Sequence, residues 1–162
     1  MKFRYFLVFL VLLASSTALL ATHNRAGEIT YEQIGPLTFR ATITTYTKTT
    51  SVPADRDSLE ICWGDGSCEF VLRVNGPLDP NGVPQGDPLP NNIKFNQYIA
   101  THTYPARAMY TISMTDPNRN GDILNVNPPN SDQVPFHLAT ELFILNPQFQ
   151  GTNSTPTLLQ PP

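Results

Sequence analysis

Histidine, cysteine, tryptophan and charge are all scarce in this 162-residue chain: it holds three histidines, two cysteines and one tryptophan, and 14% of its residues are charged. The histidines are His23, His102 and His137, which stand far apart, so the four clustered ligands of a structural zinc site are not expected. No stretch sets a serine or cysteine nucleophile beside a histidine and an acid, and no acidic pair is singled out for glycoside hydrolysis. The sequence therefore predicts a protein that is not an enzyme.

Long hydrophobic runs are absent apart from one at the N-terminus. Lys2 and Arg4 precede the apolar run 6–13, and small residues follow, with cleavage predicted after Ala18 or Ala21. The run is shorter than the roughly 20 apolar residues of a spanning helix, which makes an uncleaved anchor the weaker alternative. Residues 1–21 are thus predicted to be a signal peptide, and the chain is expected to be secreted or displayed on the cell surface.

An excess of basic residues is also missing. The whole chain has 10 basic and 13 acidic residues, and residues 1–21 contain two of the basic residues and no acid, which leaves 8 against 13, or −5. A negative surface disfavours nucleic acid and anionic membranes as partners. We expect the partner to be a surface protein or a glycan, and further domains of a longer chain are expected as well.

Sixteen prolines and nine glycines divide the chain into short runs, which argues against long helices. Most runs alternate apolar and polar residues, as half-buried strands do. They include 27–34, 37–44, 59–63, 68–74, 93–99, 110–114 and 136–144. The predicted fold class is an all-β, Ig-like antiparallel sandwich in a single domain over residues 22–146, with a barrel as the structural alternative.

Two segments lack this pattern. Residues 75–92 carry five prolines and three glycines and are predicted to be a long surface loop. Residues 147–162 are rich in proline, asparagine and threonine, and we interpret them as a linker-like C-terminal segment leading to another module. On this view the chain is the front piece of a longer protein.

In an exported protein, two cysteines predict one disulfide, here Cys62–Cys68 across a turn. Leu59, Ile61 and Trp63 alternate as an inward face, which turns Cys62 outward. Cys68, however, shares the phase of the residues that we expect to point inward on the next strand, namely Phe70, Leu72 and Val74. A β-bulge just after the turn is predicted to reconcile the two faces.

The turn between the cysteines reads Trp63-Gly64-Asp65-Gly66, and His102-x-Tyr104 and the strand opening at Tyr110 follow it. Together they resemble the PKD-type immunoglobulin-like domain. With six further motifs (22–31, 44–47, 52–56, 73–76, 101–105 and 116–121), the chain is similar to the N-terminal region of large Bacteroidetes proteins called gliding motility-associated C-terminal domain-containing proteins. The resemblance covers the mature chain and implies a surface or extracellular protein, often exported by the type IX system. The sorting domain of that family has no match here.

A candidate calcium loop is formed by Asp116, Asn118, Asn120 and Asp122, because oxygen ligands recur at every second position and Gly121 stands sixth. Position twelve is Asn127 in place of the bidentate glutamate of an EF-hand, and Pro117 interrupts the loop. The alternative is a turn in which these residues bend the backbone, and calcium is the cofactor to consider if the loop binds one.

Three functional hypotheses follow. The first is a non-catalytic extracellular module that acts as a spacer or adhesion domain. The second is a carbohydrate-binding module of a secreted multidomain enzyme, for which Tyr46, Tyr98 and Phe143 fall in an outward or ambiguous phase. The third is a small domain stabilised by calcium.

Overall fold

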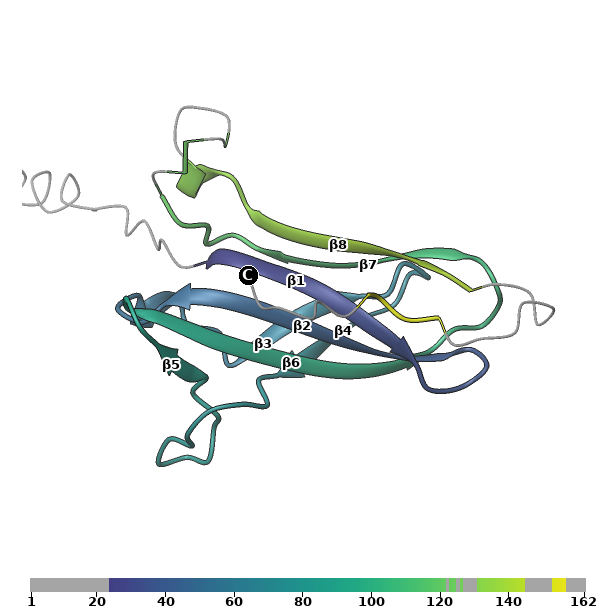
Figure 1. Cartoon of the computed structure of the whole chain (residues 1–162), viewed down its shortest axis with the longest axis horizontal. Helices are drawn as coiled ribbons and strands as arrows, with labels where there is room; N and C mark the ends of the chain where they lie inside the picture. Colours follow the sequence, from purple (N-terminus) through teal and green to yellow (C-terminus); the bar gives the residue numbers. More distant parts are fainter. Residues whose placement is uncertain (1–23, 122, 125, 127–130, 145–152, 157–162) are drawn as a thin grey trace, which may run out of the picture.

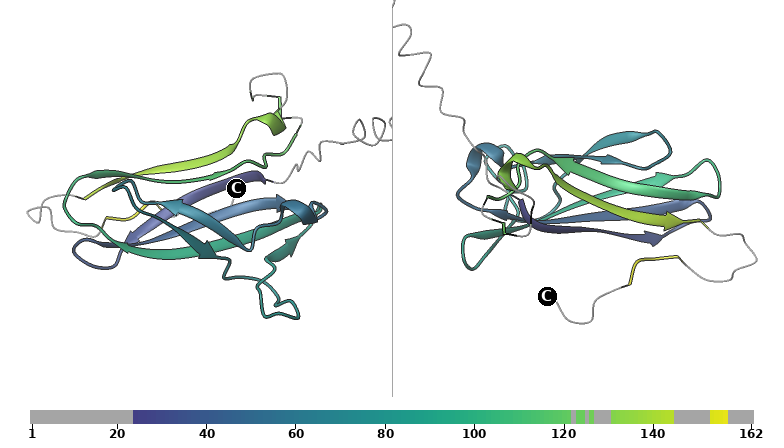
Figure 2. Two further views of the ribbon diagram at one scale, coloured as in Figure 1. Left: turned by 180° about the vertical axis from the view of Figure 1, so that it is seen from behind. Right: turned by 90° about the horizontal axis from the view of Figure 1, so that it is seen from above.

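The computed structural model describes residues 24–121, 123–124, 126, 131–144 and 153–156. Two antiparallel four-stranded sheets lie face to face in it, as the views in Figures 1 and 2 show. The predicted all-β sandwich is therefore confirmed over the barrel alternative. Between the two sheets, an isolated antiparallel bridge joins Arg73, directly after the strand β4 (Cys68–Leu72), to Tyr98 of the other sheet. The predicted signal peptide lies outside the described residues. Among the residues that are described, no helix is long and apolar enough to cross a membrane.

The first sheet has the strand order β1-β2-β6-β5, and the second has the order β4-β3-β7-β8. Their bounds are β1 Asn24–Gln33, β2 Thr38–Lys48, β6 Ile93–Thr103, β5 Asp87–Leu89, β4 Cys68–Leu72, β3 Ser58–Cys62, β7 Met109–Asp116 and β8 Phe136–Phe143. Two single-turn 3-10 helices, η1 Val52–Ala54 and η2 Ser131–Gln133, connect strands. This is the strand order of immunoglobulin-type sandwiches, with β4 as an additional strand beside β3.

Alternation of side chains explains where the core lies. On β2 the inward residues Phe39, Ala41 and Ile43 are almost fully buried, as the apolar-polar alternation predicts. On the facing sheet the same holds for the alternating apolar residues of β3 and β7. The central core thus joins both sheets and includes Ile29, Leu59, Ile61, Trp63, Tyr98, Tyr104, Ile112, Met114 and Leu142.

The predicted phase of β4 is wrong. Val71 is buried, whereas Phe70, Leu72 and Val74 are exposed. Cys62 and Cys68 are direct cross-strand partners in an unbroken register, so no bulge is needed to join them. The apolar alternation misled because Arg73 takes an inward position on this segment.

The segment 75–92 is more ordered than the predicted surface loop. It contains the edge strand β5, which pairs with β6, and an antiparallel bridge between Leu78 and Pro84. The part between β4 and β5 projects from one side of the sandwich (Figure 1). Turns rich in glycine and proline can thus still supply an edge strand, because an edge needs only half of its backbone hydrogen bonds.

Within the predicted C-terminal linker, residues 153–156 are described, and they extend the first sheet. Ser154 forms an antiparallel bridge with Glu32, and the backbone N–H of Thr155 donates to the carbonyl of Tyr31 over 2.9 Å. The backbone N–H of Gln33 donates to the carbonyl of Asn153. This short pairing covers part of the free edge of β1, which would otherwise be open to other strands.

Candidate functional site

The Trp63-Gly64-Asp65-Gly66 motif forms the tight turn between β3 and β4. The backbone N–H of Trp63 donates to the carbonyl of Ser67, which closes the hairpin. Gly64 and Gly66 both have positive φ, at 83° and 95°, a region that residues with a Cβ atom rarely adopt. Gly64 also lies directly against the backbone of Thr111 on β7, so the turn is packed onto the neighbouring strand.

His102 approaches this turn from the other sheet. Its ring stacks on the indole of Trp63, with centroids 4.8 Å apart and planes 14° apart, and its Nε2 lies 2.7 Å from Oδ2 of Asp65. The indole N–H of Trp63 donates to Oε1 of Glu69 over 3.0 Å. A single group of side chains therefore ties the end of β6 to the β3–β4 hairpin.

Two tyrosines extend this cluster. Tyr104 stacks on Tyr110 at 4.2 Å and donates its hydroxyl to the carbonyl of Trp63. Tyr110, near the start of β7, donates its hydroxyl to the carbonyl of Ala106, four residues upstream. A hydroxyl that reaches back in this way from the start of this strand is the tyrosine corner of immunoglobulin-type sandwiches. Burial raises the pKa of Tyr104, so the phenol stays a neutral donor.

All seven motif residues of the sequence analysis thus meet at one end of the sandwich: Trp63, Gly64, Asp65, Gly66, His102, Tyr104 and Tyr110. Their arrangement does not assemble a hydrolytic triad. The hydroxyl of Ser67 donates to Oδ1 of Asp65 over 2.6 Å, and no described contact joins it to His102. A nucleophilic serine needs the histidine as its base. Here Ser67 and His102 both contact Asp65, so these polar groups act as structural hydrogen-bond partners.

The hydrogen bond from the Ser67 hydroxyl, supported by the Ser67 backbone N–H and by His102, lowers the pKa of Asp65 to about 2. Because this folded-state pKa lies below that of the unfolded chain, the bonds stabilise the fold above about pH 4. We expect stability to fall as the pH drops from about 4 to about 2. Asp65→Asn should flatten this part of the pH profile, measured as the urea midpoint at each pH. Equal acid sensitivity in the variant would contradict this role.

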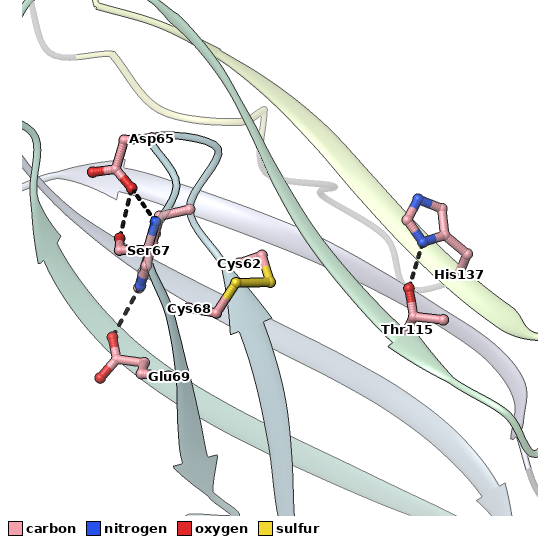
Figure 3. The surroundings of a disulfide bond; sticks show 8 residues. Cys62, Asp65, Ser67, Cys68, Glu69, Thr115 and His137 are labelled. Atoms are coloured by element: carbon pink, nitrogen blue, oxygen red, sulfur yellow. Dashed lines mark hydrogen bonds between the residues drawn. A yellow bond between two sulfur atoms is a disulfide. The ribbon is translucent and has the colours of Figure 1, made fainter.

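Cys62 and Cys68 form a disulfide across the hairpin, with Cα atoms 4.1 Å apart. Figure 3 shows Asp65, Ser67 and Glu69 on one side of it, and the Thr115–His137 hydrogen bond on the other. The Trp63–Ser67 bond fixes the register, so the cysteines occupy a non-hydrogen-bonded pair, where facing Cα atoms come closest. The bond therefore staples an edge strand whose register the turn has already set.

Removing this disulfide should have a modest effect. For a closed ring this small, the chain-entropy model gives a loss of about 2 kcal/mol for Cys62→Ser/Cys68→Ser. The measurement is urea unfolding of the double variant beside the oxidised chain, with the dithiothreitol-reduced wild type as a second comparison. Reduced wild type and double variant should agree. A loss well above this value would show that the disulfide also holds the second sheet, which contains β3 and β4, against the core.

A second polar cluster, which the sequence analysis did not identify, lies at the other end of β4. The Arg73 guanidinium is almost fully buried and contacts both carboxylate oxygens of Asp55, at 3.2 and 3.3 Å. It also donates to Oδ1 of Asn96 over 2.7 Å and to the carbonyl of Gln85. Lys94 pairs with the same carboxylate at 2.6 Å. This cluster joins η1, β4 and β6 and anchors the loop before β5.

The candidate calcium loop forms a hydrogen-bonded turn. The carboxylate of Asp116 is almost fully buried, where it accepts the backbone N–H of Asn118 over 2.7 Å and the Nε–H of Arg56 over 3.2 Å. The carbonyl of Asn118 accepts both the backbone and side-chain N–H groups of Asn24. Asn120 donates its side-chain amide to the carbonyl of Gly121, and Asp122 lies outside the described residues.

These contacts agree with the turn alternative, because the Asp116 oxygens face an arginine and a backbone N–H. No group of three or more histidine, cysteine, aspartate or glutamate side chains is placed to hold a metal ion in the part of the chain that the structure describes. The calcium loop stays a prediction of the sequence.

The three aromatic residues considered for glycan binding do not form a platform. Tyr98, which we placed in an outward or ambiguous phase, is buried and donates its hydroxyl to the carbonyl of Arg56. Tyr46 is half-buried and packs against Phe95 with ring centroids 5.7 Å apart. Phe143 is exposed at the end of β8, away from both.

Comparison with known proteins gave no relative from which a family or activity could be taken: no protein-family model, no curated protein and no solved structure matches this chain.

Proposed function

We propose that this chain is a non-catalytic extracellular module, a spacer or adhesion domain of a secreted or surface-attached protein. The proposal rests on one observation: the polar motif side chains are engaged in contacts within the fold. Asp65, His102 and Glu69 bind one another, Trp63 or the turn backbone. Side chains so engaged hold two sheets together, and function is then left to the outer surface. The resemblance to gliding motility-associated proteins supports the same role.

Protection of the strand edges supports work outside the cell. The disulfide staples the edge strand β4, and residues 153–155 cover part of the edge of β1. At the other end of β1, the backbone of Asn24 donates to the carbonyl of Asn118 and accepts from Asn120. Each device limits fraying and unwanted strand pairing, which a protein exposed to solvent and mechanical load must avoid.

The test is the location and intact mass of the native protein in its own cells and medium. We expect it in the medium or on the surface, accessible to added protease on intact cells, with the Cys62–Cys68 bond formed. A mass far above that of residues 22–162 would identify it as one module of a longer surface protein, and a mass near it would identify a free-standing secreted domain. A protein protected inside intact cells, with reduced cysteines, would contradict the proposal.

A further inference from the structure

The C-terminal end of β4 is joined to the first sheet. Directly after β4, Arg73 forms an antiparallel bridge with Tyr98 of β6. The backbone N–H of Val74 then donates to the carbonyl of Gln97 over 2.9 Å. Because Arg73 and Tyr98 are buried, the residues next to them on both strands direct their side chains outward. The outer faces of the two sheets therefore join into one surface at this seam.

Apolar side chains gather on the joined surface. Leu72 and Ile99 stand opposite each other in the register of the bridge, and they are 65% and 41% exposed. Phe70 and Val74 lie on either side of Leu72 along the same face and are 73% and 50% exposed. Single exposed apolar residues are common, but four neighbours on two strands form a patch, and such patches mark interaction surfaces. We call these four residues the seam patch.

Beside Phe70 the outer face is hollowed. The hollow has a volume of about 310 Å³, and the carboxylates in its lining are those of Asp55, Asp57, Glu60 and Asp116. Basic side chains pair with Asp55 and Asp116. Among the described residues no cation pairs with Asp57 or Glu60, and Glu60 stands directly opposite Phe70 in the β3–β4 register. The seam patch therefore borders uncompensated negative charge.

Charge distinguishes the possible occupants of this surface. Residues 22–162 hold 8 basic and 13 acidic residues, a net charge of −5, so a second copy of the chain would bring like charges together. A basic partner instead meets the two free carboxylates. The hollow is at the lower end of the roughly 300 to 1,000 Å³ of ligand pockets, which suits one long side chain of a partner whose remaining residues lie on the seam patch.

We propose that the seam patch docks an extended segment of a partner polypeptide that carries both basic and apolar residues. Its apolar side chains cover Leu72 and Ile99, and its lysine or arginine enters the hollow to reach the carboxylates there. The stem of the basic side chain packs on the ring of Phe70, over which a cation is attracted. From β3 to β6 across the patch is about two strand spacings, roughly 10 Å, which three extended residues span. The inference rests on the proposed adhesive role and names the class of partner.

The test uses the purified, oxidised chain and nine-residue peptides with blocked ends. The first peptide has lysine at positions 1 and 3, leucine at positions 5 and 7, and serine elsewhere. The second has glutamate in place of lysine, and the third has serine in place of leucine. Fluorescence anisotropy at low salt measures affinity, and amide shifts in nuclear magnetic resonance spectra locate the bound peptide. We expect the first peptide to bind with a dissociation constant below about 1 mM and to shift the amides of Phe70, Leu72 and Ile99, and the other two to bind at least about tenfold more weakly.

Variants separate the apolar and charged contributions. Leu72→Thr/Ile99→Thr should weaken binding of the first peptide more than about tenfold, because the leucines lose their apolar contacts. Glu60→Gln/Asp57→Asn should weaken it about fivefold, as expected for exposed charge pairs. The second variant should also remove most of the salt dependence of binding, since the attraction that salt screens is lost.

The matched controls are Phe143→Thr and Glu141→Gln. Both residues are exposed on β8, at the opposite edge of the sheet that contains β4. Each control removes the same kind of side chain as a test variant, away from the seam patch, and should bind the first peptide like the wild type. Urea unfolding of every variant checks that changes in binding do not arise from unfolding.

The inference is overturned if the first peptide does not bind, if the glutamate or serine peptide binds equally well, or if the amide shifts lie away from the seam patch. Unchanged affinity in both test variants would also overturn it. A dimer of the chain alone, seen by sedimentation equilibrium and dissociated by Leu72→Thr/Ile99→Thr, would assign the seam patch to a second copy instead. These outcomes are independent of the proposed function, since a chain found on the cell surface that fails to bind the peptides retains its proposed location and loses only this partner.

Discussion

Gly64→Ala should destabilise the protein by roughly 3 to 5 kcal/mol, which is a large loss for a substitution that removes no interaction. The residue has φ of 83°, which costs an L-residue about 1 to 2 kcal/mol. Its new Cβ would also lie 2.6 Å from the backbone nitrogen of Thr111 and 2.7 Å from its carbonyl oxygen. Those are backbone atoms of a sheet strand, so the hairpin must move away from β7.

Gly66→Ala in the same turn is the matched control. Its φ is 95°, but a Cβ there meets no atom within 4 Å. It should therefore cost about 1 to 2 kcal/mol, the conformational cost alone. Urea unfolding followed by Trp63 fluorescence measures both variants, and the difference between them reports the packing against Thr111. Equal losses would show that the turn is not seated on β7 as described.

Arg73→Met should cost about 3 kcal/mol, because removing one partner of a buried ion pair leaves the rest of the cluster unsatisfied. Asp55 keeps Lys94, but Asn96 and the carbonyl of Gln85 lose their donor. Methionine matches much of the volume of the side chain, so the loss reports the polar contacts more than a cavity. Thermal or urea unfolding measures it.

Arg40→Met is the comparison, because Arg40 also pairs with a carboxylate, that of Glu32, with both side chains about half exposed. An exposed pair contributes about 0 to 1 kcal/mol. Similar losses at Arg73 and Arg40 would show that burial of the Arg73 cluster does not stabilise the fold. A larger loss at Arg73 that also frees the segment before β5 to exchange its amides would confirm the anchoring role.

The sequence predicted the parts of the fold that obey alternation. The inward faces of β2, β3 and β7 follow from apolar phase. The contacts of His102 and Tyr104 with the Gly-Asp-Gly turn join residues far apart in the chain, and the motifs alone did not predict them. The order of the strands in the sheets is not encoded in local periodicity, because it depends on contacts between residues far apart in the chain.

The two strands with misleading apolar patterns, β4 and β6, fail for one physical reason. Their inward positions hold Arg73 and Asn96, which satisfy each other, while apolar Phe70, Leu72 and Ile99 are turned outward. A buried arginine is acceptable here because Asp55 and Asn96 accept hydrogen bonds from its two terminal nitrogens, and those partners come from separate parts of the chain. Single-sequence alternation holds no signal for such a cluster.

Amide hydrogen exchange along β4 in the oxidised chain tests most directly whether the Trp63–Ser67 turn and the disulfide hold β4 against β3 in the described register. We expect alternation: slow exchange at Glu69, Val71 and Arg73, whose N–H groups point to β3 and Asp57, and fast exchange at Phe70, whose N–H group points away from β3. Slow exchange at Phe70, or a shift of the pattern by one residue, would contradict this register.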